Sequence, residues 1–149
     1  MAIDFVKLFD RFNSLSILII GDVMIDAYWW GGVNRISPEA PVAVVAVNEK
    51  ENRLGGAANV ALNIAAMGAK PVLCSVVGDD FQGRELCRLM QEQNMDTKGI
   101  VYSSKRPTTV KTRIIGNKAQ MLRIDEETDA NISLEEEKIV NCKPMAKTK

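Results

Sequence analysis

Histidine is absent from this sequence of 149 residues. Its absence excludes catalytic dyads and triads that depend on an imidazole base, and it excludes metal sites built on histidine. No apolar run approaches the roughly 20 residues that a membrane-spanning helix needs. The formal net charge is +0, so no long-range attraction favours nucleic acid or an anionic membrane. We therefore expect no nucleic-acid partner and no membrane partner.

Cysteine is scarce, and its positions form no metal-binding or redox pattern. Cys74, Cys87 and Cys142 are far apart in the sequence, with no Cys-x-x-Cys pair. This usage is typical of buried thiols in a reducing compartment rather than of disulfides or zinc sites. The N-terminus has an acid at position four and no long apolar stretch, so it lacks the features of a secretory signal. We expect a cytoplasmic protein without a metal site in this chain.

Strand and helix patterns alternate along most of the chain. The apolar runs Ser16–Ile20 and Pro71–Val77 predict two buried strands of a parallel sheet. Helices are expected at 4–14, 57–67 and 81–94 and after Ser133, and further strands at 100–102, 108–115 and 120–124. This order predicts an α/β fold with a doubly wound sheet. The polar residues 141–149 follow the last helix, and we expect this tail to fray.

Residues 27–53 interrupt this alternation. Short-strand and turn signals dominate the segment, from Tyr28-Trp29-Trp30 to Val42–Val47, and no crossover helix is indicated. We expect a small β unit outside the main sheet. Trp29 and Trp30 are adjacent and therefore point to opposite faces of a strand, so one can pack inward while the other lies at an interface.

The most informative segment for function combines two glycines with the start of a helix. Gly55 and Gly56 come directly before a helix whose first turn holds Asn59 and which Gly68 closes. Glycines let a ligand approach the backbone closely, and the free N–H groups of the helix start face that ligand. The Asn59 amide can both donate and accept, which suits a sugar hydroxyl. The pattern predicts a ligand-binding turn.

Carboxylates at two strand ends offer further candidates. Asp26 follows the first strand, at the edge where open α/β sheets bind ligands, and a carboxylate can accept two sugar hydroxyls. The alternative for Asp26 is a turn-forming role. Asp79 and Asp80 follow the second strand, where paired carboxylates suggest metal binding or acid–base work. An N-cap at Asp80 explains that pair more simply, and we favour it.

Two segments resemble a known family. The stretch from Arg53 to Ala69 resembles the first signature of the ribokinase/PfkB carbohydrate kinases. Ser37–Val42, which reads Ser-Pro-Glu-Ala-Pro-Val, is similar to a segment of the heptose-7-phosphate kinases of that family. The resemblance implies that residues 1–140 are the N-terminal part of a PfkB-type kinase domain. It also implies a ribokinase-like doubly wound sheet, present in part, with a small β lid at about 27–53, and a tail outside the family pattern.

On the same basis, the sugar would be bound by Asp26, Gly55, Gly56 and Asn59. Weaker candidates that the resemblance suggests are Arg35, Glu39, Arg123 and Asp125. Arg35 would suit a phosphate and Glu39 a hydroxyl or an ion pair, but both are equally compatible with solvated loop charges. Lys111 and Arg113 are two residues apart and therefore share one face of a strand. This placement is just as compatible with exposure to solvent as with a role in the site.

The second signature of the family, Asp-Thr-x-Gly-Ala-Gly-Asp, does not occur in this sequence, and no Gly-rich Walker loop replaces it. In the family that signature supplies the catalytic base and a cradle for the nucleotide phosphates. The resemblance therefore implies the sugar-binding part of an ATP-dependent kinase for heptose 7-phosphate in lipopolysaccharide core synthesis, inactive by itself. Mg-ATP would serve the complete enzyme and would not bind this chain strongly. The expected partners are a small sugar phosphate and a second copy of the chain, paired through the lid.

Two alternatives to a kinase stay open. The chain could be a non-catalytic module that binds a sugar phosphate or dimerises, and sugar binding without turnover would indicate it. A dinucleotide-binding domain is disfavoured, because the first strand ends in Gly21-Asp22-Val23-Met24 instead of Gly-x-Gly-x-x-Gly.

Overall fold

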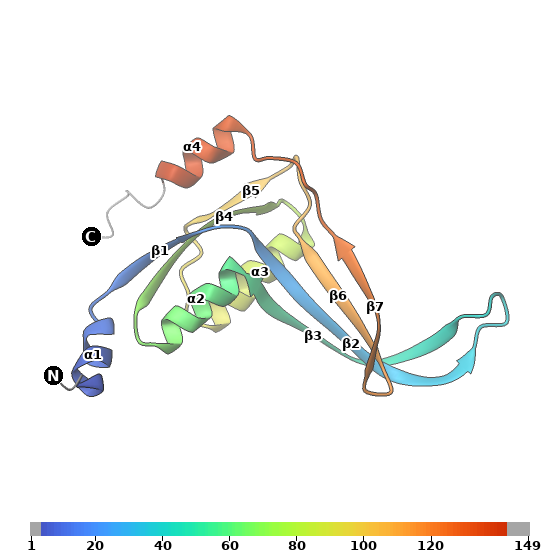
Figure 1. Cartoon of the computed structure of the whole chain (residues 1–149). Helices are drawn as coiled ribbons and strands as arrows, with labels where there is room; N and C mark the ends of the chain where they lie inside the picture. The colour runs from blue at the N-terminus through green and yellow to red at the C-terminus, as the bar shows by residue number, and fades with distance from the viewer. Residues whose placement is uncertain (1–3, 143–149) are drawn as a thin grey trace.

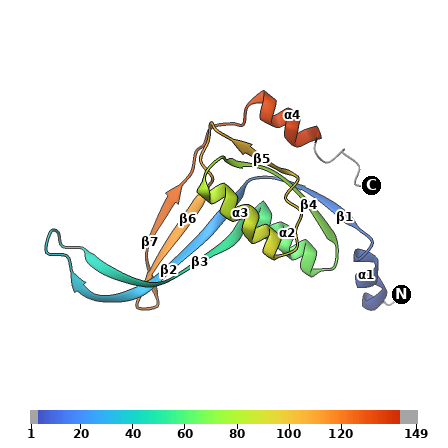
Figure 2. The same ribbon diagram turned by 180° about the vertical axis from the view of Figure 1, so that it is seen from behind.

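A computed structural model describes residues 4–142, which form two sheets and four helices. The first sheet, called the parallel sheet below, has the strand order β1-β4-β5. Its strands are β1 (Ser16–Ile20), β4 (Lys70–Gly78) and β5 (Ile100–Ser103). Helices α2 (Ala57–Ala66) and α3 (Phe81–Glu92) lie on one side of it, and α4 (Leu134–Cys142) lies on the other (Figure 1, Figure 2). The α/β class and the partial doubly wound arrangement are confirmed.

A separate four-stranded sheet, called the second sheet below, has the order β3-β2-β6-β7. Its strands are β2 (Val23–Ile36), β3 (Ala43–Gly56), β6 (Val110–Gly116) and β7 (Ala119–Glu126). Strands β2 and β3 form an antiparallel hairpin whose far end reaches away from the helices (Figure 1). A β unit outside the parallel sheet is confirmed, but its strands are long rather than short. Strands β6 and β7 also join it, because β6 pairs in parallel with β2.

Strand β1 is less buried than its apolar run suggested. Among the described strands it pairs only with β4, and Leu18 and Ile20 are 48% and 57% exposed. Ile19 points the other way and packs against the core, on the side that α2 contacts. The prediction of a fully buried strand was therefore wrong for one face of β1.

The helix ends follow the local sequence signals. Gly68 has a φ of +92° directly after α2, as a helix-closing glycine requires. At the start of α4, Glu136 accepts a hydrogen bond from the Ser133 N–H at 2.7 Å, and its own N–H donates to the Ser133 hydroxyl at 3.3 Å. Hydrogen bonds from Ser103 and Ser133 lower the pKa of Glu136 to about 2. Helix α4 includes residues 141 and 142, and the rest of the predicted tail lies outside the described residues.

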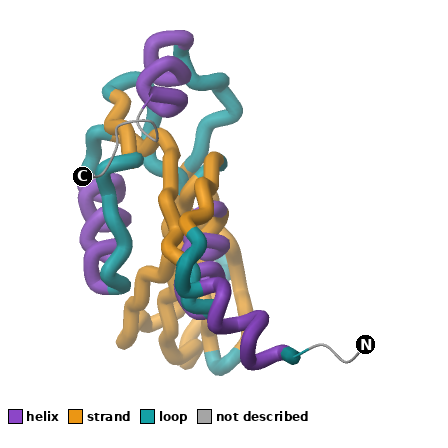
Figure 3. Tube along the Cα trace, turned by 90° about the vertical axis from the view of Figure 1, so that its left-hand side faces the viewer, coloured by secondary structure: helices purple, strands orange, loops and turns teal. Residues whose placement is uncertain are grey.

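The main core joins the parallel sheet, helices α2 and α3, and the base of the second sheet. Its fully buried side chains include Ile25 of β2, Val77 of β4, and Leu86 and Met90 of α3. Figure 3 shows α4 and the N-terminal helix α1 (Phe5–Phe12) at opposite ends of the molecule. None of the helices in residues 4–142 is long and apolar enough to cross a membrane. The core therefore holds the part of β2 on either side of Asp26, and the far end of the β2–β3 hairpin lies outside the core.

Candidate functional site

The two glycines before α2 form a tight turn against the start of β2. Gly56 has a φ of +59°, and a Cβ placed on it would lie 2.4 Å from the carbonyl oxygen of Asp22. That same oxygen accepts a hydrogen bond from the Ala57 N–H at 2.9 Å. A Cβ on Gly55 would lie 2.6 Å from Oδ2 of Asp26 and 2.7 Å from Cγ of Met24. The two glycines were expected to let a ligand approach the backbone. In part, it is other atoms of the chain that approach them so closely.

Asp26 is the fourth residue of β2, not a residue of the turn after β1. The reason is that β2 already begins at Val23, where pairing with β3 starts. Its Oδ1 accepts a hydrogen bond from Nη1 of Arg113 at 2.5 Å, and its side chain is 23% exposed. Among the described residues no hydrogen bond reaches Oδ2, which lies against Gly55. The carboxylate is thus half satisfied, with one oxygen directed at the glycine turn.

Asn59 lies in the first turn of α2, three residues after Gly56, and is exposed. Within residues 4–142 its side-chain amide makes no hydrogen bond, so both its donor and its acceptor are open to a ligand. The structure therefore brings Asp26 against Gly55, and places Gly56 next to it and Asn59 in the adjoining helical turn.

Charged side chains cover the face of the second sheet that carries Asp26. Strand pairing places Arg53, Asp26, Lys111 and Asp125 in one row across the four strands, with alternating signs. Lys111 contacts Asp125 at 3.1 Å and Glu127 at 2.7 Å. These two carboxylates raise the pKa of Lys111, so it stays cationic at neutral pH. We call this surface the charged face.

Two of the weaker candidates belong to the charged face. Arg123 donates two hydrogen bonds to Asp125, at 2.8 and 2.9 Å. This contact, and that of Lys111, holds the pKa of Asp125 below its ordinary value. Arg35 and Glu39 lie elsewhere: Arg35 is nine residues further along β2, about 30 Å from Asp26 at strand spacing, and Glu39 is in the exposed turn beyond. The structure does not bring these two residues to Asp26.

Aromatic rings line the charged face next to Asp26. Tyr28 and Trp30 are stacked with ring centres 5.5 Å apart. The guanidinium carbons of Arg53 and Arg113 lie 4.7 and 5.2 Å from the centre of the Tyr28 ring. The hydrogen bond to Asp26 raises the pKa of Arg113. The sequence alone does not indicate the pairing of Arg113 with Asp26, because the two residues lie 87 positions apart.

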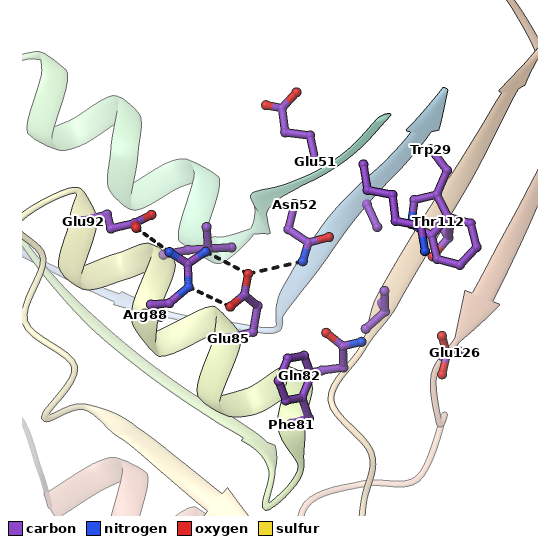
Figure 4. A pocket seen from close by; sticks show the side chains of 14 residues that line it. Trp29, Glu51, Asn52, Phe81, Gln82, Glu85, Arg88, Glu92, Thr112 and Glu126 are labelled. Atoms are coloured by element: carbon purple, nitrogen blue, oxygen red, sulfur yellow. Dashed lines mark hydrogen bonds and ion pairs between the residues drawn. The ribbon is translucent and has the colours of Figure 1, made fainter. Parts of the chain in front are cut away.

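Two hollows flank the second sheet. One of about 480 Å³ lies beside the glycine turn and is lined in part by Asp22, Met24 and Glu127. The other, of about 580 Å³, lies between α3 and the opposite face of the sheet (Figure 4). None of the predicted site residues lines either hollow, and Arg88 in the second hollow pairs with Glu85 and Glu92. The first hollow lies nearer the candidate site, because Asp22 and Met24 of its lining lie against Gly55 and Gly56.

Asp80 is a structural residue, as favoured from the sequence. Its Oδ1 caps α3 by accepting from the Gly83 N–H at 2.7 Å, and it also accepts from the Thr108 hydroxyl at 2.8 Å. The Thr108 N–H donates to Oδ2 at 2.8 Å. Burial alone would raise the pKa of Asp80, but these hydrogen bonds outweigh it and lower the pKa. Asp79 instead forms an exposed ion pair with Arg84.

Sites for Mg-ATP generally combine carboxylates that hold the metal ion with a Gly-rich loop that cradles the phosphates. Within residues 4–142 no cluster of three His, Cys, Asp or Glu side chains could hold a metal ion. The sequence carries no Gly-rich phosphate loop either. The carboxylates of the charged face can accept the hydroxyls of a polyhydroxylated ligand, and each arginine and lysine of the face is paired with a carboxylate.

The family model described as pfkB family carbohydrate kinase matches residues 14–149. The chain belongs to this carbohydrate kinase family. Bifunctional protein HldE of Wolinella succinogenes is 49% identical over 122 residues, which are 82% of this chain and 26% of that protein. D-beta-D-heptose 7-phosphate kinase of Bordetella bronchiseptica is 49% identical over 118 residues, which are 79% of this chain and 37% of that protein.

A solved structure supports the same kinship. An uncharacterized sugar kinase from Pyrococcus horikoshii, in complex with ATP, aligns with a TM-score of 0.56 and 28% identity. The alignment covers 85% of this chain and 40% of that one. The chain of this pfkB family member thus spans about a quarter to two fifths of the length of these relatives. The ribokinase-like fold expected from the resemblance is confirmed.

Proposed function

We propose that this pfkB family chain is the sugar-binding part of a cytoplasmic, ATP-dependent kinase for D-glycero-D-manno-heptose 7-phosphate, which serves lipopolysaccharide core synthesis. The observation that carries the proposal is the half-satisfied Asp26 carboxylate against the Gly55-Gly56 turn. The name of the Bordetella bronchiseptica relative, D-beta-D-heptose 7-phosphate kinase, supports this choice of sugar.

In this proposal the chain orients the sugar and does not activate it. Oδ2 of Asp26 accepts a sugar hydroxyl, the backbone at Gly55 and Gly56 lets the ring approach, and Asn59 holds a second hydroxyl. The contribution of such residues to phosphoryl transfer is positional. The catalytic base and the ATP site belong to the family signature that this sequence does not contain.

The test is isothermal titration calorimetry with heptose 7-phosphate. Asp26→Ala should weaken binding roughly ten- to a hundredfold, because a hydrogen bond to a charged group is lost. Arg88→Gln on the opposite face is the matched control and should bind like the unchanged chain. An unchanged dissociation constant in both Asp26→Ala and Asn59→Ala would contradict the site. A parallel titration with Mg-ATP should give no strong binding, and turnover of ATP by this chain alone would contradict its assigned role.

A non-catalytic sugar-phosphate-binding or dimerisation module is the second candidate. The observation that favours it is the apolar far end of the β2–β3 hairpin, where Ile36 and Val42 are exposed. Binding of the sugar phosphate without turnover in a family-length protein that carries this segment would favour the module over the kinase.

We also propose that two copies pair through this hairpin, whichever candidate holds. Ile36 is 70% exposed, which is unfavourable for an isolated apolar side chain in water. Ile36→Glu should shift the chain from dimer to monomer in sedimentation velocity at micromolar concentration. Asp10→Ala, a change on the distant helix α1, is the control and should leave the mass unchanged. A monomeric mass of the unchanged chain at every concentration would refute the pairing.

A further inference from the structure

We infer that Arg113 is the positioning residue of the sugar site: it fixes Asp26 so that one carboxylate oxygen is presented to the sugar. The inference rests on the proposed function of Asp26. Nη1 of Arg113 contacts Oδ1 at 2.5 Å, and both side chains are about one quarter exposed. Because Oδ1 is held in this way, Oδ2 is directed toward Gly55, whose missing side chain leaves room for the carboxylate itself, and no hydrogen bond within residues 4–142 occupies this oxygen.

In the part of the chain that the structure describes, no other cation holds the Asp26 carboxylate. Arg53 lies opposite Asp26 on β3, but its guanidinium pairs with Glu51 at 2.5 Å. Lys111 lies opposite Asp26 on β6, but its ammonium pairs with Asp125 and Glu127. Within residues 4–142, Arg113 is thus the sole ion-pair partner of Asp26. The orientation of the carboxylate depends on this one contact.

Arg113 is itself restrained from both ends. Strand β6 anchors its backbone opposite Tyr28, and its guanidinium lies over the Tyr28 ring. Tyr28 is stacked in turn on Trp30. A planar guanidinium that lies over a ring and is bonded to a carboxylate has little freedom to rotate. A lysine ammonium on its flexible side chain would keep that freedom. The geometry is therefore that of a preorganised acceptor rather than of a mobile surface ion pair.

Calorimetry with heptose 7-phosphate tests the inference on the full chain. Arg113→Gln should weaken binding about tenfold, because Asp26 loses its fixed orientation. Arg113→Lys should recover part of that loss, since an ammonium restores the charge but not the ring-held plane. The double variant Asp26→Ala/Arg113→Gln should bind no more weakly than Asp26→Ala alone, because Arg113 acts through Asp26.

The outcomes separate the two proposals. If Asp26→Ala weakens binding while Arg113→Gln does not, the sugar site stands and the positioning role is refuted. Additive losses in the double variant would also refute it, because Arg113 would then contact the ligand directly. If Asp26→Ala has no effect, the proposed sugar site fails and the inference falls with it. Urea unfolding of each variant, with Arg88→Gln as an arginine control on the opposite face, excludes a loss of folded protein as the cause.

Discussion

Replacing Gly56 with alanine is expected to lower the free energy of unfolding by about 2–4 kcal/mol. Gly56 adopts a φ of +59°, where L side chains are strained, and the added Cβ would lie 2.4 Å from the Asp22 carbonyl oxygen. That oxygen is a backbone atom held by the Ala57 N–H, so it cannot move aside without losing this hydrogen bond to the first residue of α2. Urea unfolding followed by tryptophan fluorescence measures the loss.

Gly21→Ala is the matched control for this prediction. Gly21 lies between β1 and β2, next to Asp22, whose carbonyl oxygen faces Gly56. Its φ is not positive, and among the described residues a Cβ there would meet only the Cβ of Ala57, at 3.4 Å. Alanine at such a position reduces the freedom of the unfolded chain and is tolerated or slightly stabilising. Equal stabilities of Gly56→Ala and Gly21→Ala would show that the glycine turn is not under the constraint described.

The features that the sequence predicted correctly are those formed by residues that lie close together in the sequence. Asp80 caps α3, Gly68 closes α2, and Ser133 with Glu136 opens α4, because each hydrogen bond or φ value involves residues at most three positions apart. The glycine pair before α2 was found for the same reason. Local chemistry of this kind can be read directly from residue types and their spacing.

The features that the sequence did not reveal depend on strand register. Periodicity shows that Lys111 and Arg113 share a strand face, but not that β6 pairs in parallel with β2 and brings Arg113 to Asp26. Pairing with β3 extends β2 back to Val23, so Asp26 lies within a strand instead of in a turn. A one-residue shift in register would move each of these side chains to the other face. The charged face is therefore a property of the folded pairing.

Removal of the Asp80 side chain is expected to cost about 3 kcal/mol of unfolding free energy. Asp80→Ala deletes the N-cap of α3 and leaves the N–H and hydroxyl of Thr108 without their acceptor. The substitution also affects a second, buried hydrogen bond, because the Thr108 hydroxyl that Asp80 orients accepts from the Gly78 N–H at 2.9 Å. Asp79→Ala is the neighbouring control: it removes an exposed ion pair to Arg84 and should cost less than about 1 kcal/mol.

The pH dependence of this loss of stability tests the role of the Asp80 carboxylate in a second, independent way. The pKa of Asp80 is lowered in the folded state, so its contribution is fully present above the unfolded value of about 3.9. It is lost as the pH falls through the lower folded-state pKa, because the protonated carboxyl no longer accepts these hydrogen bonds as a charged group. The stability gap between the unchanged chain and Asp80→Ala should therefore be constant near neutral pH and shrink below about pH 4. A gap that stays constant down to pH 2 would show that the charge of Asp80 does not hold the Thr108 loop to α3.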